Sequence, residues 1–494
     1  MNPRNRVLWF GAPPTPHERR AFAERNLVLE HEHPTGEAAL RDVCGFVMNA
    51  VPPYVDESAM ATMKFLADAI RHGALAFLLA ANDAAQGLLQ DCTPVELRAT
   101  ERIISRTAPY EPSEYAERIA RHDPGPAYSP TLSVTAAGPP VPSNVEFLVR
   151  RAFGDCTEVH LEPLDGGLSA TTYQVHARLQ QSQAGPRPMP FFAKVDTLAK
   201  IRSELRNYEV YAASHIPFNL RPNLDTARCT EGAEDGILVG NFVENSRPLW
   251  DVALDGMGER AIHGLFEETL MGWRRQAYQS EPTRGHVANA LASVLRYREI
   301  LPEHVRRASE FGPIVEPAEL LMRLLNTPEQ TFYVGPSHGD LHGRNVRVRR
   351  DDAILIDLAN IHPAPLCADI ATLEVWLACQ DPGTLHRGQD LEQWMAVMRT
   401  VYSLHVLQQP IKPGSLPHDY EWLESCIRQL RKVSGEVCAC PEEYPIAVAL
   451  NLASRARYVN DSEGEDGKVR RAFAYYLACE LVNAIVSSVR GGPV

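Results

Sequence analysis

The chain has 494 residues, of which 45% are hydrophobic and 22% are charged, and its formal net charge is −13. These values are typical of a soluble globular protein with two or three domains. The acidic balance argues against a general nucleic-acid binder, because phosphate binding requires clustered lysine and arginine side chains. The early apolar run Val7–Phe10 is too short for a signal peptide, and the late apolar segment Ala472–Val489 contains Glu480 and Asn483, which favours a packed helix. We therefore expect a cytoplasmic protein with no nucleic-acid or membrane partner.

Residues 1–121 alternate apolar runs with helical patterns, which predicts parallel βαβ units. We expect strands at 6–11, 27–31, 43–48, 73–80 and 102–107, and helices at 17–25, 60–72 and 112–120. This order resembles a response-regulator receiver, which has a flavodoxin-like α/β fold. A receiver implies acidic residues after the first strand and a phospho-acceptor aspartate after the third, where this chain has Gly11-Ala12 and Asn49-Ala50. We interpret this part as a receiver-like domain that does not accept phosphate and contacts a protein partner; any small α/β domain is the alternative.

Residues 122–143 read H-D-P-G-P-A-Y-S-P-T-L-S-V-T-A-A-G-P-P-V-P-S. Such a proline-rich segment is typical of an extended, semi-rigid linker, and we place a domain boundary there. The ten cysteines show no disulfide framework, which favours reduced thiols. Cys426, Cys438 and Cys440 form a sequence cluster, but no fourth ligand lies at a zinc-finger spacing, so we predict no metal site among them.

The stretch 337–371 carries the strongest chemical pattern. Asp340 and Asn345 lie five residues apart in a polar loop, and an alternating V-R-V-R run, a turn and the apolar strand Ala353–Ile356 lead to Asp357. Phosphoryl transfer uses an aspartate to accept the hydroxyl proton, an asparagine five residues later for Mg²⁺, and a second aspartate after a hairpin for the metal that bridges the phosphates. The pattern therefore predicts a phosphotransferase site; a surface hairpin with acidic turn residues is the alternative.

The loop His338–Asn345 reads H-G-D-L-H-G-R-N, and the later residues Pro365 and Asp369-Ile370-Ala371 follow at a short distance. These residues resemble the aminoglycoside phosphotransferase and choline kinase group of the protein-kinase-like fold, over roughly residues 144–494. The resemblance implies a bilobal α+β domain, with an amino lobe at 144–245 and a largely helical carboxy lobe at 246–494. It also implies ATP and Mg²⁺ as cofactors.

The same resemblance assigns roles to the residues of the loop. Asp340 would be the base that deprotonates the acceptor hydroxyl, and Asn345 and Asp357 would hold Mg²⁺. His338 and Asp369 would support the loop by hydrogen bonding.

The expected amino lobe begins with the hairpin Glu162–Val175. Its glycines, Gly166 and Gly167, allow a close backbone approach to phosphates, and Ser169 can add a donor. Lys194, within the apolar strand Phe191–Val195, matches the kinase lysine that reaches the α- and β-phosphates.

That lysine needs a carboxylate partner on the helix expected at 201–215. Glu204 and Glu209 are the candidates, and we favour Glu204 because Tyr208 and Tyr211 lie on its side of the helix. After the strand at 236–242, the residues Phe242, Val243 and Glu244 stand where a kinase hinge would contact adenine; a plain connecting strand would look the same.

The carboxy lobe is expected to be helical, at 258–279, 286–310, 316–325, 391–407, 420–433, 446–458 and 468–489. The function predicted is an ATP- and Mg²⁺-dependent phosphotransferase that acts on a hydroxyl of a small molecule. One alternative is a protein Ser/Thr kinase with a protein substrate. Two features argue against it: Gly339 replaces the arginine expected in such a kinase, and only a short segment separates Asp357 from Asp369. The other is a nucleotide-sensing pseudokinase scaffold in a signalling or defence system. The acceptor is not encoded in any motif, because a fold does not fix a substrate.

Overall fold

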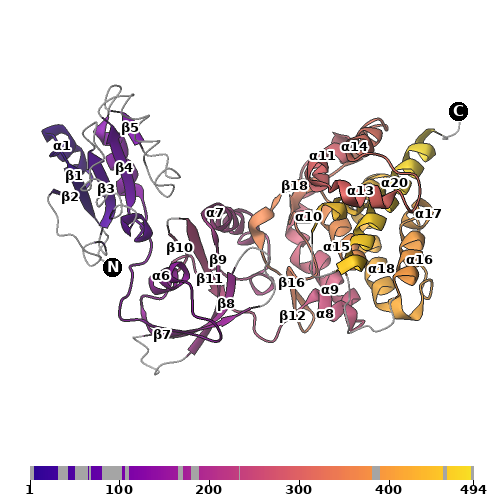
Figure 1. The fold of residues 1–494 in the computed structure, drawn as a ribbon, viewed down its shortest axis with the longest axis horizontal. Coiled ribbons are helices and arrows are strands. Elements are labelled where there is room, and N and C mark those ends of the chain that lie inside the picture. Colours follow the sequence, from indigo (N-terminus) through magenta and orange to yellow (C-terminus); the bar gives the residue numbers. More distant parts are fainter. Residues whose placement is uncertain are drawn as a thin grey trace. The chain divides into compact units, whose positions relative to one another are not determined.

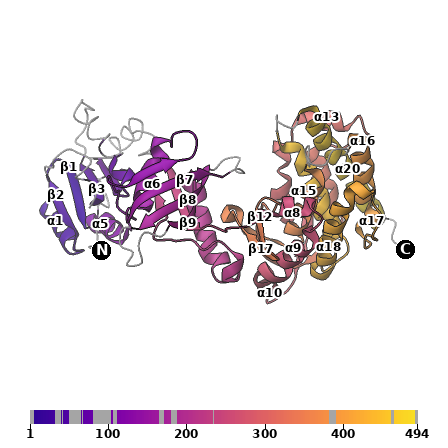
Figure 2. The same ribbon diagram turned by 90° about the horizontal axis from the view of Figure 1, so that it is seen from below.

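The computed structural model describes residues 5–31, 40, 43–49, 65, 68–80, 103–105, 111–164, 171–179, 188–232, 234–380, 390–459 and 464–490. The chain divides into two units (Figures 1 and 2). The first unit contains residues 1–202 and 223–242, and the second contains residues 203–222 and 243–494. The predicted combination of α/β and helix-rich parts is confirmed.

A parallel five-stranded sheet begins the first unit, with the strand order β2-β1-β3-β4-β5. Its strands and described helices are β1 (Arg6–Gly11), α1 (Pro16–Ala23), β2 (Val28–His31), β3 (Val43–Asn49), β4 (Leu75–Ala80), β5 (Ile103–Ser105) and α5 (Pro112–Arg121). This order is the flavodoxin-like one, and separate apolar clusters pack on the two faces of the sheet. The predicted strands are confirmed, most of the helix predicted at 60–72 lies outside the described residues, and the receiver resemblance stays a prediction.

The carboxyl ends of β1 and β3 are joined by an amide side chain. Asn49 is 4% exposed, and its Nδ2 donates a hydrogen bond to the carbonyl of Ala12 over 3.0 Å. Gly11 adopts a φ of +85°, and a Cβ there would lie 2.1 Å from the carbonyl oxygen of Asn49. At this edge, Gly11, Ala12 and Asn49 offer no carboxylate.

A six-stranded sheet follows, with the order β10-β11-β9-β8-β7-β6. Its elements are β6 (Ser133–Ala136), α6 (Ser143–Ala152), β7 (Cys156–Pro163), β8 (Thr171–Leu179), β9 (Pro188–Thr197), β10 (Thr230–Glu231) and β11 (Asp235–Asn241). Helix α6 covers one face through Val145, Leu148 and Val149. Within the predicted linker 122–143, β6 pairs with β7 instead of bridging two domains, because Val134 and Ala136 pack against this core.

Arg151 joins the two sheets of the first unit. Its side chain is fully buried, and its guanidinium donates hydrogen bonds to the carbonyls of Arg71, Pro124, Pro126 and Glu231, at 2.6–3.1 Å. Arg71 lies just before β4 of the parallel sheet, Pro124 and Pro126 lie in the proline-rich segment, and Glu231 lies in the edge strand β10. One side chain therefore holds the start of the segment that was predicted to be an extended, semi-rigid linker.

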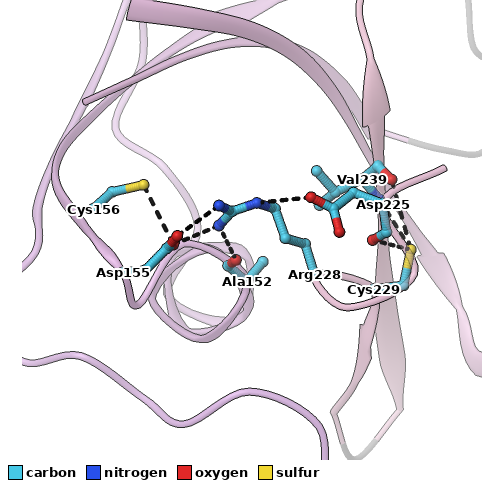
Figure 3. Close-up of polar contacts among 7 residues, drawn as sticks. All are labelled: Ala152, Asp155, Cys156, Asp225, Arg228, Cys229 and Val239. Atoms are coloured by element: carbon cyan, nitrogen blue, oxygen red, sulfur yellow. Dashed lines mark hydrogen bonds and ion pairs between the residues drawn. The ribbon is translucent and has the colours of Figure 1, made fainter. Parts of the chain in front are cut away.

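A second arginine, Arg228, fastens the segment before β10 to the end of α6 (Figure 3). Its Nη1 and Nη2 donate to the two carboxylate oxygens of Asp155 at 2.5 and 2.7 Å, and its Nε donates to Asp225 at 3.1 Å. The guanidinium carbon lies 5.3 Å from the Phe153 ring centroid and 5.4 Å from that of Phe191. The hydrogen bonds from Arg228 lower the pKa of the Asp155 carboxyl below its ordinary value of 3.8.

Helix α7 (Leu198–Asn207) continues into a π-helical turn, Tyr208–Ala212, and both lie within the segment predicted to be helical. The second unit otherwise consists mainly of helices: α8 (Leu249–Leu254), α9 (Gly258–Gly264), α10 (Met271–Ala277), α11 (Val287–Ala290), α12 (Ala292–Leu295), α13 (Pro302–Ala308), α14 (Pro317–Leu325), α15 (Ala368–Cys379), α16 (Leu391–Val401), α17 (Leu404–Leu407), α18 (Glu421–Val437), α19 (Glu443–Ser454) and α20 (Gly464–Arg490).

Three of the long helices predicted in this unit are wrong as single elements, and one of them, at 391–407, is divided into α16 and α17. The segment 286–310 breaks at Arg296, which has a φ of +42°, and restarts at Pro302 in the first turn of α13. The segment 258–279 is divided by the π-helical turn Leu265–Thr269. Helix α15 was not predicted.

Short strand pairs hold the segments between these helices. They are β12 (Arg247–Pro248) with β16 (Val346–Arg349) and β17 (Asp352–Leu355), β13 (Thr283–Gly285) with β14 (Gln330–Phe332), and β15 (Val334–Ser337) with β18 (His362–Pro365). The predicted strand–turn–strand around Asp351 is therefore present. Among the described helices, α20 is long and apolar enough to cross a membrane, but 61% of its apolar window is buried within the protein, as expected for a packed helix.

We predict that Arg228→Ala lowers the free energy of unfolding by about 2 kcal/mol at pH 7, because it leaves Asp155 without its charged hydrogen-bond donor. The folded pKa of Asp155 is depressed, so this contribution is complete above pH 3.8 and is lost as the pH falls through the folded value. Half of the Asp155 side chain is exposed, so solvent screens its charge. We therefore expect the pH-dependent part of the stability loss to be smaller than the pH-independent part. Urea unfolding at pH 7 and pH 3 measures both effects, with the exposed Arg178→Ala as the control; equal stability of the two variants at pH 7 would contradict the prediction.

Candidate active site

The predicted catalytic loop is held by one buried carboxylate, that of Asp369 in the first turn of α15. Its oxygens accept hydrogen bonds from Ser337 Oγ at 2.8 Å, from the His338 amide at 2.7 Å and from the Gly339 amide at 3.3 Å. Asp369 is 6% exposed, and it contacts the chain exactly where β15 ends and the loop begins. The prediction that Asp369 supports the loop is consistent with these contacts.

Gly339 turns the chain away from β15 with a φ of +76°. A Cβ at this position would lie 2.4 Å from the carbonyl oxygen of Asn360, so only glycine fits without moving the backbone. This constraint gives a physical reason for Gly339 where a protein kinase has arginine. Asp340 follows directly and is partly exposed.

The loop is also tied to the strand that ends before Asp357. The buried His338 ring makes a hydrogen bond from Nε2 to the Ile356 carbonyl at 2.9 Å, and the Ile356 amide donates to the Asn345 carbonyl at 2.9 Å. The Nδ2 of Asn345 donates to the carbonyl of Asp340 at 3.0 Å. The Oδ1 of Asn345 accepts no hydrogen bond from the described residues, so it is available as a ligand. These hydrogen bonds link Asp340, Asn345 and Ile356, the residue directly before Asp357.

Asp357 follows β17 with a φ of +63°, a conformation that a non-glycine residue adopts only when its surroundings impose it. The second half of α7 supplies these surroundings. Glu204 Oε1 accepts a hydrogen bond from the Leu358 amide at 3.3 Å, and Asn207 Nδ2 donates to the Leu358 carbonyl at 2.8 Å. Ser203 Oγ donates to the Ala359 carbonyl at 2.9 Å. The turn after Asp357 is therefore fixed on both its donor and its acceptor side.

Of the two glutamates considered for α7, Glu204 is 6% exposed and Glu209 is exposed. Glu204 is thus the inward-facing one, and it contacts the turn after Asp357. Lys194 lies in the middle of β9, opposite Thr172 on one side and Leu238 on the other. Its predicted pairing with Glu204 stays a prediction.

Six further residues were predicted to bind the nucleotide, in the glycine hairpin and at the hinge. Gly166, Gly167 and Ser169 lie outside the described residues. Phe242 is the last residue of the first unit, and the chain returns to the second unit at Val243. Phe242 and Val243 are half-buried and Glu244 is exposed. Their contact with adenine stays a prediction.

His342 was not singled out from the sequence as a site residue, yet it lies within the predicted catalytic loop. Its ring stacks on Trp376 with centroids 5.3 Å apart and an interplanar angle of 19°. Burial lowers the pKa of His342 to about 4, against the opposing charges of Asp340 and Asp357. The imidazole is therefore neutral at pH 7 and adds no positive charge to the site.

A cavity of about 530 Å³ lies within the second unit, beside Asp340. Residues from four segments line it: Ser293, Val294, Arg296 and Glu299 around α12; Ser337, Gly339, Asp340 and His342 in the loop; Asn360, His362, Ala368, Thr372, Val375 and Trp376 up to α15; and Asn451, Ser454, Arg455, Arg457 and Tyr458 at the end of α19. Of these lining residues, only Asp340 was predicted from the sequence as a site residue. The R-A-R run after the apolar α19 was the available signal.

The cysteine cluster expected from the sequence is rearranged in space. Ligand atoms of Cys367, Cys438 and Glu443 all lie within 4.8 Å of one another, and Cys426 and Cys440 are not part of this group. Burial raises the pKa of Glu443 to about 7. Among the described residues this set offers three donors, one fewer than a closed structural zinc site, and we assign no metal to it.

Comparisons with known proteins add the following. The family model described as Ternary complex associated domain 9 matches residues 268–443. No curated protein matches the chain. Among solved structures, an aminoglycoside phosphotransferase from Streptomyces rimosus matches with 18% identity and a TM-score of 0.31, covering 59% of this chain and 99% of the other.

A choline kinase from Cryptosporidium parvum matches with 10% identity and a TM-score of 0.36, covering 68% of this chain and 93% of the other. A glucosamine kinase matches with 13% identity and a TM-score of 0.29, covering 66% and 93%. The structural neighbours thus include small-molecule kinases of the predicted group, at identities that leave activity and acceptor open.

We predict that Asp369→Ala destabilises the loop by about 1–3 kcal/mol, because the Ser337 hydroxyl and two backbone amides lose their buried acceptor. Hydrogen exchange followed by mass spectrometry should show faster exchange across 337–345 and little change in α18. Asp351→Ala, in the exposed turn between β16 and β17, is the matched control. Unchanged exchange of the His338 and Gly339 amides in Asp369→Ala would show that the carboxylate does not hold the loop.

Proposed function

We propose that this chain is an ATP- and Mg²⁺-dependent phosphotransferase that transfers the γ-phosphate to a hydroxyl group of a small molecule. The observation that carries the proposal is the network in which Asn345 contacts the carbonyl of Asp340 and pairs with the residue before Asp357. Three residues with the sequence order of a phosphoryl-transfer site are thereby linked: Asn345 directly to the backbone of Asp340, and to Asp357 through its neighbour Ile356. A surface hairpin with acidic turn residues would not need the buried Asp369 anchor.

In this proposal Asp340 accepts the proton of the acceptor hydroxyl. It is partly exposed, and it lines the cavity, so an acceptor bound there can reach its carboxylate. The contacts of Asp369, Ser337 and Gly339 fix the loop in advance, and such positioning supplies much of the rate in phosphoryl transfer. His338 acts by linking the loop to the end of β17.

Asn345 and Asp357 would hold Mg²⁺. An amide oxygen and a carboxylate are hard ligands that suit this ion, and Asn345 Oδ1 is available. When bound, the ion neutralises phosphate charge. The hydrogen bonds from α7 to the turn after Asp357 would keep the carboxylate in one orientation.

Lys194 would bind the α- and β-phosphates, supported by Glu204. The hairpin residues Gly166, Gly167 and Ser169 would cover the phosphates, and the segment Phe242–Glu244 would contact adenine. These roles come from the sequence pattern and the resemblance.

The small-molecule acceptor is favoured over a protein by the segment between Asp357 and Asp369. It consists of a short 3₁₀ turn, Leu358–Asn360, and the strand β18, which pairs with β15. This connection leaves no room for the long activation loop that protein kinases order by phosphorylation. A pseudokinase scaffold, which binds nucleotide without transfer, differs from the proposal only in turnover.

For residues 1–121 we propose a receiver-like contact module that does not switch by phosphorylation. The position expected for the phospho-acceptor is Asn49, whose amide is already bonded to Ala12. An amide cannot form an acyl phosphate. Its role would be to bind a protein partner through its surface.

Asp340→Asn should retain AMP-PNP binding but lose phosphoryl transfer by about 10²-fold or more, because the positioned base is removed. ADP release in the presence of pooled small hydroxyl compounds measures turnover, and calorimetry measures nucleotide binding. Asp351→Asn, which removes an exposed carboxylate of the same segment, should behave as the wild type. Turnover by Asp340→Asn at the wild-type rate would exclude the assigned role, and wild-type binding without any turnover would favour the pseudokinase.

Incubation of the full chain with acetyl phosphate and Mg²⁺ should add no phosphate to residues 1–121. Intact mass followed by peptide mapping measures this, and a receiver with an intact acidic pocket serves as the positive control. A stoichiometric gain on any aspartate of residues 1–121 would show that the domain is a working receiver.

A further inference from the structure

We propose that the cavity beside Asp340 binds an anion, so that the acceptor is a small hydroxylated compound that carries a phosphate or a carboxylate group. This inference rests on the proposed function, since it takes the cavity as the acceptor site. It goes beyond that function by naming the chemical class of the acceptor.

The cavity is lined by three arginines and two carboxylates. Arg296 follows α12, and Arg455 and Arg457 lie on the 3₁₀ turn after α19. Of the two carboxylates, Asp340 is assigned to the reacting hydroxyl, which leaves Glu299 as the counter-charge.

Glu299 compensates the arginines poorly. Its Oε2 lies 3.8 Å from Nη1 of Arg296 and 3.8 Å from Nη1 of Arg457, beyond hydrogen-bond distance in both cases. Its side chain is 57% exposed, so these ion pairs are screened by solvent. Arg455 forms no ion pair with a carboxylate of the described residues.

The guanidinium groups also have unused donors. Three buried nitrogens have no hydrogen-bond acceptor among the described residues: Nε of Arg455, and Nε and Nη1 of Arg457. The side chain of Arg457 is only 16% exposed. A buried cation with unused donors is costly in free energy unless an anion approaches it. Arg296, Arg455 and Arg457 together form what we call the arginine wall of the cavity. Its positive charge is explained if a ligand supplies the missing negative charge.

The half-buried Arg455 and Arg457 are held in place before any ligand binds. Tyr458 lies against both guanidinium groups, with its ring centroid 5.2 Å from Cζ of Arg455 and 4.8 Å from Cζ of Arg457. Arg457 Nη2 also donates to the Tyr458 hydroxyl at 2.6 Å. Their backbone continues directly from α19, whose residues are buried throughout. This arrangement reduces the entropy that an anion must offset on binding.

The chemistry of the wall selects the ligand. A guanidinium presents parallel N–H donors that match the oxygens of a carboxylate or a phosphate. A volume of about 530 Å³ accommodates a compound of metabolite size. The acceptor must also bring a hydroxyl to Asp340, whereas an acceptor bearing several ammonium groups would meet three like charges. A hydroxylated anion satisfies both requirements.

Four compounds with one carbon scaffold test the inference: glucose, glucosamine, glucose 6-phosphate and gluconate. Each is titrated calorimetrically into the full chain saturated with AMP-PNP and Mg²⁺, so that the nucleotide's own phosphates occupy their site. At least one of the two anions should bind 10-fold or more tightly than glucosamine. The two anions distinguish a phosphate from a carboxylate as the recognised group.

The double variant Arg455→Ala/Arg457→Ala should weaken anion binding at least 10-fold, and Arg298→Ala, an exposed neighbour that does not line the cavity, should not. The Arg296 side chain is 55% exposed, so Arg296→Ala should leave the fold intact. This variant should weaken anion binding several-fold, and it replaces the double variant as the test if the double variant does not fold. The inference is overturned if no anion binds more tightly than glucosamine, or if anion binding survives these variants. Failure of AMP-PNP to bind wild-type protein would instead refute the proposed function.

Discussion

The carboxylate of Asp369 is the contact on which the rest of the candidate site depends. It is buried at the start of α15 and accepts three hydrogen bonds from consecutive residues at the end of β15. A buried carboxylate is stable only when its oxygens are satisfied, so the loop cannot leave without a large desolvation cost. The loop conformation then determines where Asp340 stands and how Asn345 reaches the hairpin.

A second constraint acts on Asp357, which we propose as a metal ligand. Asp357 has a left-handed backbone, and the second half of α7 holds the following turn through Ser203, Glu204 and Asn207. The strain is thus offset by hydrogen bonds to a helix that lies about 150 residues earlier in the sequence. In many sites such strain accompanies preorganisation, because the side chain is aimed before the ligand arrives. The loop and the turn after Asp357 are rigid for different reasons, and the backbone pairing of Asn345 with Ile356 joins them.

The part of the site that the sequence predicts is the part made of neighbouring residues. Asp340, Asn345 and Asp357 occur within one short stretch, and strand–turn–strand patterning alone brings them together. The central strands of the parallel sheet were likewise predictable, because β1, β3 and β4 are largely apolar runs. The arginine wall was not predictable, since Arg296 and Arg457 are distant in sequence and meet only through the packing of α12 and α19.

Other differences have local causes that periodicity does not report. Arg296 adopts a positive φ and breaks a segment that is helical in its pattern, and Pro302 restarts it. Helix α15 is almost entirely buried, so it lacks the polar face that reveals a helix in a sequence. Strand β6 is four residues long and sits among prolines, so composition masked its pairing with β7.

We propose that Asp340, Asn345 and Asp357 form one metal–nucleotide site. An experimental structure of the full chain with AMP-PNP and Mg²⁺ tests it most directly. We expect Asn345 Oδ1 and the Asp357 carboxylate to ligate the ion at about 2.0–2.1 Å, with the Asp340 carboxylate free of the metal and directed at the γ-phosphate. A nucleotide bound elsewhere, or a metal ion with neither Asn345 nor Asp357 among its ligands, would contradict it.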